Sequence, residues 1–190
     1  MPSERLLSSL KEDHKYMIKL LHLLEQEIKT LDAAQVVRVN LDRLLEMTDY
    51  LNQYPEICHH PIEERMFGML ASKSLPEHEQ ALIDKVIDEH GMLDALAELL
   101  EVKIARYLAA NCSKASLLRT ADMFLRQQIK HIECEQNHVF TLCCNYLQNG
   151  EWQELQALEE EIRQADDELC SYELLRQKIA GISSAALRGR

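Results

Sequence analysis

Apolar residues recur along most of this chain at alternating steps of three and four positions. The first such stretch runs from Leu7 to Leu31, and the second runs from Val37 to Met69. The third runs from Ile83 to Tyr107, and the fourth from Leu118 to Tyr146. This spacing forms an apolar stripe along a helix and does not suit a strand, in which side chains alternate at every residue. The pattern therefore predicts four amphipathic helices.

Breaks in the pattern divide the chain into five predicted helices. Ser3, Pro76 and Ser113 are suitable helix starts. We predict helices at residues 3–31, 34–71, 76–110, 114–148 and 151–180. The predicted fold is all-α: an up-down-up-down four-helix bundle over residues 1–148, with a C-terminal fifth helix and tail, residues 149–190, in the same domain. The fifth helix has its own apolar stripe, so we expect it to cover the bundle or to form a homodimer with another copy.

Composition narrows the class of protein further. A chain of 190 residues can bury a sizeable core, and five Gly with four Pro are too few for a loop-rich β fold. The formal net charge of −11 argues against nucleic acid as a partner, because nucleic acid requires a basic face. No apolar run has the length of a membrane span, and no leader begins the chain, so we expect no membrane partner and a cytoplasmic location. The six cysteines lack Cys-x-x-Cys spacing, which favours reduced thiols.

Histidines interrupt the apolar stripes, one on each of the four predicted bundle helices. Two of them are followed four residues later by a glutamate, and residues four apart on a helix share a face. The resulting set of donors is His14, His59, Glu63, His90, His131 and Glu135. An unpaired polar ring in an apolar seam costs roughly a few kcal/mol, so each histidine needs a partner. The pattern predicts a metal centre inside the bundle, with buried hydrogen bonds as the alternative.

The second helix contains two overlapping His-x-x-x-Glu pairs, His59/Glu63 and His60/Glu64. We prefer His59/Glu63, because this pair continues the apolar seam of its helix. Pro61 removes one helical hydrogen bond and can rotate the chain locally. His60 and Glu64 therefore stay open as additional ligands or as outer partners of the ligands.

Two further readings of the donors remain open. The spacings Glu56-x-x-His59 and Glu135-x-x-His138 match ferritin-like di-iron bundles, but those bundles also need an inward glutamate where the first and third helices carry histidines. His138 also shares a face with His131, so it is a candidate buried partner of the ligands. The other alternative is a metal-free helical interaction module. This interpretation does not explain why six ligand-type side chains lie at the same height in the bundle.

Taken together, the four spacings resemble the hemerythrin-like, or HHE cation-binding, family over about residues 6–147. That family has a lone His on the first helix, His-x-x-x-Glu on the second, a His on the third, and a His with a downstream carboxylate on the fourth. The resemblance implies a non-haem di-iron centre with an oxo or hydroxo bridge. His14 and His59 would ligate one iron and His90 and His131 the other, and both ions would be bridged by Glu63 and Glu135. Zinc or manganese can replace iron in such a ligand set.

The resemblance also implies a function: binding of O₂, NO or peroxide in stress response or iron homeostasis. Oxygen-carrying members have a second His one turn after the third-helix ligand, where this chain has Asp94. The chain therefore looks more like the branch linked to iron-centre repair and to iron or oxygen sensing. An iron donor for repair and a peroxide- or NO-consuming enzyme are the alternatives, although no nucleophile or nucleotide-binding loop indicates a dedicated enzyme. In metal-free protein we expect Glu63 and Glu135 to raise each other's pKa.

Overall fold

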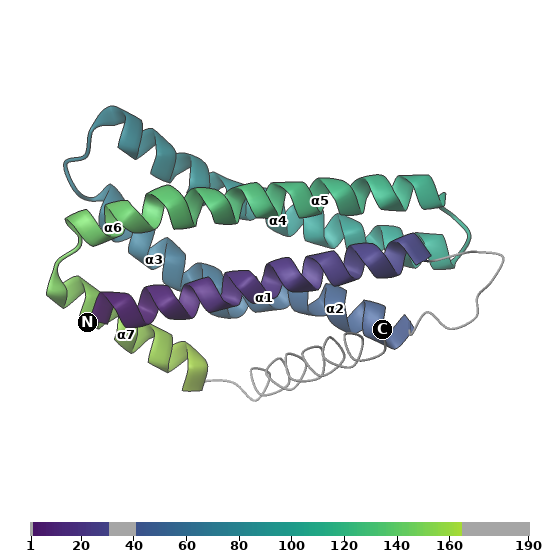
Figure 1. The fold of residues 1–190 in the computed structure, drawn as a ribbon, viewed down its shortest axis with the longest axis horizontal. Helices are drawn as coiled ribbons and strands as arrows, with labels where there is room; N and C mark the ends of the chain where they lie inside the picture. Colours follow the sequence, from purple (N-terminus) through teal and green to yellow (C-terminus); the bar gives the residue numbers. More distant parts are fainter. Residues whose placement is uncertain (1, 31–40, 165–190) are drawn as a thin grey trace, which may run out of the picture.

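The computed structural model describes residues 2–30 and 41–164, and within these ranges it is a helical bundle without strands (Figure 1). Helix α1 covers Pro2–Thr30 and α4 covers Glu77–Leu108. The second bundle helix consists of α2 (Leu41–Tyr54), the π-helical turn η1 (Pro55–His59) and α3 (His60–Ala71). The fourth consists of α5 (Lys114–Cys134), the π-helical turn η2 (Glu135–Val139) and α6 (Phe140–Tyr146). The additional helix α7 covers Asn149–Gln164.

The predicted all-α bundle is confirmed. Helix α1 packs against α2 and α5, and α4 packs against α2, α3 and α5, as expected when successive helices alternate in direction. The Ser113 side chain caps α5 by accepting a hydrogen bond from the Ser116 backbone N–H. Residues 34–40 of the predicted second helix and 165–180 of the predicted fifth lie outside the described residues. None of the described helices is long and apolar enough to cross a membrane.

The apolar core consists of two clusters, one on each side of a buried polar layer. One cluster lies around Tyr50 and Leu100, and the other lies around Phe67 and Trp152. Between them, along all four bundle helices, are the buried polar residues Asp13, His14, His59, His60, Glu63, His90, Gln128, His131 and Glu135. The polar layer therefore lies at mid-height in the bundle, with apolar packing above and below it.

The π-helical turn η1 adds one residue to the second bundle helix just before its polar layer. The backbone N–H of His60 donates to the Pro55 carbonyl, five residues back, in place of the α-helical partner four residues back. Pro61 follows directly, and it has no N–H to donate to Ile57. This missing donor gives a local reason for the change of winding at this point.

The second π-helical turn, η2, shifts the buried stripe of the fourth helix by one position. One additional residue rotates the following helix by about 100°. The heptad pattern predicts Leu142 and Tyr146 in the core, but both are only half-buried. The fully buried residues here are Val139, Phe140, Cys143 and Leu147. No proline accompanies η2, so the sequence offered no local signal for it.

Helix α7 covers the bundle by packing against α1 and α3. Its Trp152 and Leu155 side chains are buried in the second apolar cluster. Arg65 on α3 pairs with Glu154 on α7, and Lys73 pairs with Glu151 at 2.6 Å. Over Asn149–Gln164 the fifth helix therefore contributes to the core of the same chain.

Two glycines in helix interiors allow a test of helix propensity. A Cβ added to Gly68 or Gly91 would meet no heavy atom within 4 Å, and neither residue has a positive φ. We predict that Gly68→Ala and Gly91→Ala each raise the free energy of unfolding by about 0.5–1 kcal/mol, measured by urea denaturation. The exposed Ala95 on α4 is a matched control, because Ala95→Gly should lose a similar amount. A destabilising Gly→Ala change would contradict the open surroundings of these positions.

Candidate metal centre

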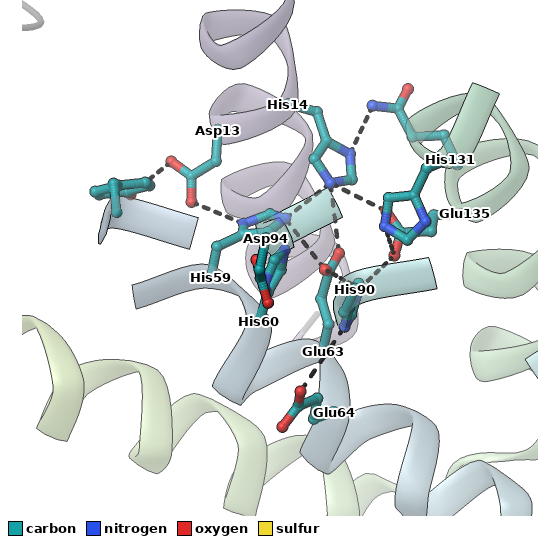
Figure 2. Close-up of polar contacts among 12 residues, drawn as sticks. Asp13, His14, His59, His60, Glu63, Glu64, His90, Asp94, His131 and Glu135 are labelled. Atoms are coloured by element: carbon teal, nitrogen blue, oxygen red, sulfur yellow. Dashed lines mark hydrogen bonds and ion pairs between the residues drawn. The ribbon is translucent and has the colours of Figure 1, made fainter. Parts of the chain in front are cut away.

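The structure brings the six predicted donors together in two groups of three. The first group is His14, His59 and Glu63, and the second is His90, His131 and Glu135. Within each group the donor atoms lie within 4.8 Å of one another, and all six residues are buried. Figure 2 shows these side chains pointing toward one another from four different bundle helices.

In the first group the donor atoms of three side chains lie close together. The Nε2 atoms of His14 and His59 lie 2.8 Å apart. Glu63 Oε2 lies 3.2 Å from His59 Nε2, and Glu63 Oε1 lies 3.4 Å from His14 Nε2. His59, the last residue of η1, and Glu63 on α3 are four residues apart, and both side chains point to the interior, as the spacing predicts.

The second group repeats this arrangement on α4 and the fourth bundle helix. Glu135 Oε1 lies 3.1 Å from His131 Nε2 and 3.4 Å from His90 Nε2. The other oxygen, Glu135 Oε2, lies 3.3 Å from His14 Nε2 in the first group. Glu63 also reaches across, since its Oε2 lies 3.7 Å from His90 Nε2. Each carboxylate therefore faces histidines of both groups.

The two carboxylates lack hydrogen bonds at several buried atoms. Among the described residues, Glu63 Oε1, Glu63 Oε2 and Glu135 Oε2 are buried and have no hydrogen-bond partner. A buried oxygen without a partner costs roughly 1–3 kcal/mol, and more when it is charged. A cation coordinated by these oxygens and the facing Nε2 atoms would remove that cost. Imidazole and carboxylate are ligands that suit iron, zinc and manganese, so the residues fit a metal centre.

The charges in the metal-free layer are held as histidine–glutamate pairs. Burial alone would lower the pKa of His59, but Glu63 and Asp13 outweigh it and raise this pKa to about 10. Burial likewise opposes the effect of Glu135 on His131, whose pKa is raised to about 9. Metal ligation requires the unprotonated Nε2 atoms, so a metal ion must displace these protons.

The expected net rise in the pKa values of Glu63 and Glu135 is wrong for this bundle. Burial and the neighbouring Glu135 do act to raise the pKa of Glu63, but His59 and His14 outweigh them and lower it. Burial acts the same way on Glu135, yet His131, His14 and His90 hold its pKa well below the usual range. The histidines therefore keep both carboxylates ionised and available as ligands.

Three outer residues contact the second ring nitrogen, Nδ1, of the candidate ligands. Asp13 Oδ2 lies 3.4 Å from His59 Nδ1, and Glu89 Oε2 lies 3.1 Å from His131 Nδ1. The side-chain amide of Gln136 lies 2.9 Å from His14 Nδ1. Such contacts fix the orientation of a ligand histidine, and a carboxylate at Nδ1 also holds the proton there and leaves Nε2 free to ligate. The spacing pattern does not single out any of the three residues, although each is adjacent in sequence to one of the six donors and so shares their level in the bundle.

The structure places His60 and Glu64 outside the two donor groups. The His60 ring is buried and stacks on the His90 ring, with centroids 4.1 Å apart and an interplanar angle of 9°. Burial and the nearby His90 and His59 lower the pKa of His60 to about 3, so its ring is neutral. Its Nδ1 lies 3.7 Å from Asp94 Oδ1, and exposed Glu64 lies 3.9 Å from His90 Nδ1. His60, Asp94 and Glu64 thus surround His90 rather than join the donors.

His138 and Glu56, which the ferritin-like arrangement requires as ligands, are both exposed. The expectation that His138 is a buried partner is therefore wrong. The additional residue in η2 places buried Val139 toward the interior instead. With Glu56 and His138 outside the donor groups, the ferritin-like reading of the site is not supported.

The fold and the buried donor groups together define a metal-binding four-helix bundle. The family model of the hemerythrin HHE cation binding domain matches residues 5–143, and the chain belongs to this family. The matched residues include all six donors, whereas α7 lies beyond them. No curated protein and no solved structure matches the chain.

The two overlapping pairs on α3 predict different mutational effects. Glu63 contributes both oxygens to the donor groups, whereas the side chain of Glu64 is 58% exposed. We predict that Glu63→Ala and Glu135→Ala each lose at least half of the bound metal, measured by elemental analysis of purified protein. Glu64→Ala, Glu56→Ala and His138→Ala are matched controls and should retain it. Metal loss in Glu64→Ala with retention in Glu63→Ala would show that the register is wrong by one residue.

Removal of metal should loosen the middle of the bundle. A metal ion that binds only the folded state stabilises it, by about 2.7 kcal/mol when the free metal is at a hundred times its Kd. We predict a markedly lower Tm for metal-free than for metal-loaded protein. Hydrogen exchange should rise first around His59 and His131, because the apolar clusters on either side remain packed. Equal Tm values for stripped and reloaded protein would place metal binding outside this layer.

Proposed function

We propose that this protein holds two iron ions between the four bundle helices and binds a small ligand there, such as O₂, NO or peroxide. The observation that carries the proposal is the sharing of carboxylates between the two donor groups. Glu135 presents one oxygen to His14 and the other to His90 and His131. Glu63 similarly contacts His14, His59 and His90. In this assignment both glutamates bridge the two ions.

The donor set favours iron that keeps room for a further ligand. Each ion would receive two histidine nitrogens and an oxygen from each of the two shared carboxylates, a set that leaves open coordination positions on non-haem iron. When bound, the ions supply redox chemistry and the capacity to bind a diatomic molecule or peroxide. Zinc or manganese would occupy the same donors without changing the residues involved.

The surrounding side chains favour a small and uncharged ligand. Phe140 stacks on the His14 ring at 5.8 Å, and Phe67 lies 6.3 Å from the His90 ring, measured between ring centroids. Both aromatic rings are buried, as are the neighbouring Ile62 and Met66. These apolar side chains limit the space beside the donors and exclude bulk water. We propose that binding of such a ligand serves the stress response or iron homeostasis in the cytoplasm.

A second candidate function is iron donation to damaged iron centres. It is favoured by the partly exposed outer contact of the second donor group. His131 Nδ1 contacts Glu89, whose side chain is 21% exposed and lies 3.4 Å from Lys85. In the first group, by contrast, His59 faces Asp13, which is only 2% exposed. An ion in the second group would therefore have the shorter route to solvent.

Metal analysis followed by anaerobic spectroscopy tests the proposal. We predict two iron ions per chain, and a change in the visible spectrum when O₂, NO or peroxide is added to reduced protein. Reversible spectra would support ligand binding, and continuous turnover of peroxide or NO would support an enzyme. Iron transfer to an apo-cluster acceptor without stable ligand binding would support the donor function. A single ion in fully loaded protein would refute the bridged pair.

A further inference from the structure

Asp13 connects the first donor group to α7, the helix beyond the family-matched residues. The Asp13 side chain is 2% exposed. Its Oδ1 accepts a hydrogen bond of 3.0 Å from the Tyr54 hydroxyl, and its Oδ2 lies 3.4 Å from His59 Nδ1. Figure 2 shows Asp13 beside His59, on the side away from Glu63. The same Oδ2 also lies 3.6 Å from a guanidinium nitrogen of Arg163 on α7.

Arg163 is itself held in place by two neighbours. Its Nε donates to Glu159 Oε1 at 3.1 Å, one turn earlier on α7, and one of its terminal nitrogens donates to Ser9 Oγ at 2.8 Å. Ser9 Oγ in turn donates to Glu159 Oε1 at 2.6 Å. Glu159 is buried although it is charged, which is uncommon unless such a residue is paired. This contact network fixes the Arg163 guanidinium against α1 and directs its positive charge toward Asp13.

We infer that Arg163 is a positioning residue for the first metal ion, acting through Asp13 on His59. An acceptor at Nδ1 keeps the proton of a neutral histidine on that nitrogen and leaves Nε2 free to ligate. His59 Nε2 is the atom that faces Glu63 and His14. Arg163 and Tyr54 hold the Asp13 carboxylate in the position where it serves as that acceptor.

The second donor group has no corresponding contact to α7 among the described residues. The outer carboxylate of His131 is Glu89. Its ion-pair partner, Lys85, belongs to the same helix and has a 61% exposed side chain. Lys85 is thus an exposed neighbour, whereas Arg163 is 39% exposed and held at three points. We therefore expect α7 to affect binding of the ion in the first donor group and not of the ion in the second.

The inference rests on the proposed metal centre, so the test begins with the stoichiometry of the wild-type protein. Metal-free full-length protein is titrated anaerobically with Co²⁺, and the two binding steps are followed by visible absorption. His131→Ala identifies the step that belongs to the second group. We expect Asp13→Asn to weaken the first-group step about 10- to 100-fold. Arg163→Gln, one contact farther out, should weaken the same step about three- to tenfold and leave the other unchanged.

Arg65→Gln is the matched control, because it removes an ion pair between α3 and α7 that does not reach the donors. It should leave both steps unchanged. In an Asp13→Asn background, Arg163→Gln should add little further loss, since the two residues act in series. Equal effects of Arg163→Gln and Arg65→Gln, or equal weakening of both steps, would overturn the inference while leaving the metal centre intact. Wild-type protein that takes up no Co²⁺ would overturn the proposed centre and the inference together.

Discussion

Glu63 and Glu135 lie fully buried in the middle of the bundle, close enough for their charges to repel. The surrounding histidines oppose this repulsion in metal-free protein and lower the pKa of both carboxylates. Ion pairs of this kind are expensive to bury, and breaking one by removing a partner is strongly destabilising. The layer therefore depends on the two apolar clusters for its place in the fold. A bound cation would in addition satisfy the buried carboxylate oxygens that have no hydrogen-bond partner.

Most of the fold and all six donors can be predicted from the spacing of residues along the chain. Steps of three and four apolar residues specify helices, and His14 and His90 stand in seam positions that otherwise hold aliphatic residues. Because each bundle helix contributes at the same height, donors that are distant in sequence meet in one layer. The preference for His59 over His60 also follows from the seam. The structure places His59 Nε2 among the donors and His60 against the face of His90.

Other features depend on contacts between helices and cannot be read from periodicity. The turn η2 adds one residue after Glu135, so Leu142 and Tyr146 lose core positions, and His138 becomes exposed. A heptad pattern assumes uniform winding, and only η1 has a nearby proline to suggest otherwise. The outer residues were missed for a different reason. Asp13 precedes His14 in sequence but contacts His59 across the bundle, so its role depends on how α1 faces the second helix.

The outer contacts make the two donor groups chemically unequal, although their inner donors are the same. In the first group, Asp13 is buried and fixed by the Tyr54 hydroxyl and by Arg163 on α7. In the second, Glu89 is partly exposed, so solvent can screen its charge and compete with its contact to His131. Metal exchange begins when a ligand detaches from the ion. A histidine whose Nδ1 contacts a buried and fixed side chain detaches less readily. In the proposed centre, the same ligand set would hold one ion firmly while the other exchanges with solvent. This difference arises from α7 and the outer residues rather than from the family motif.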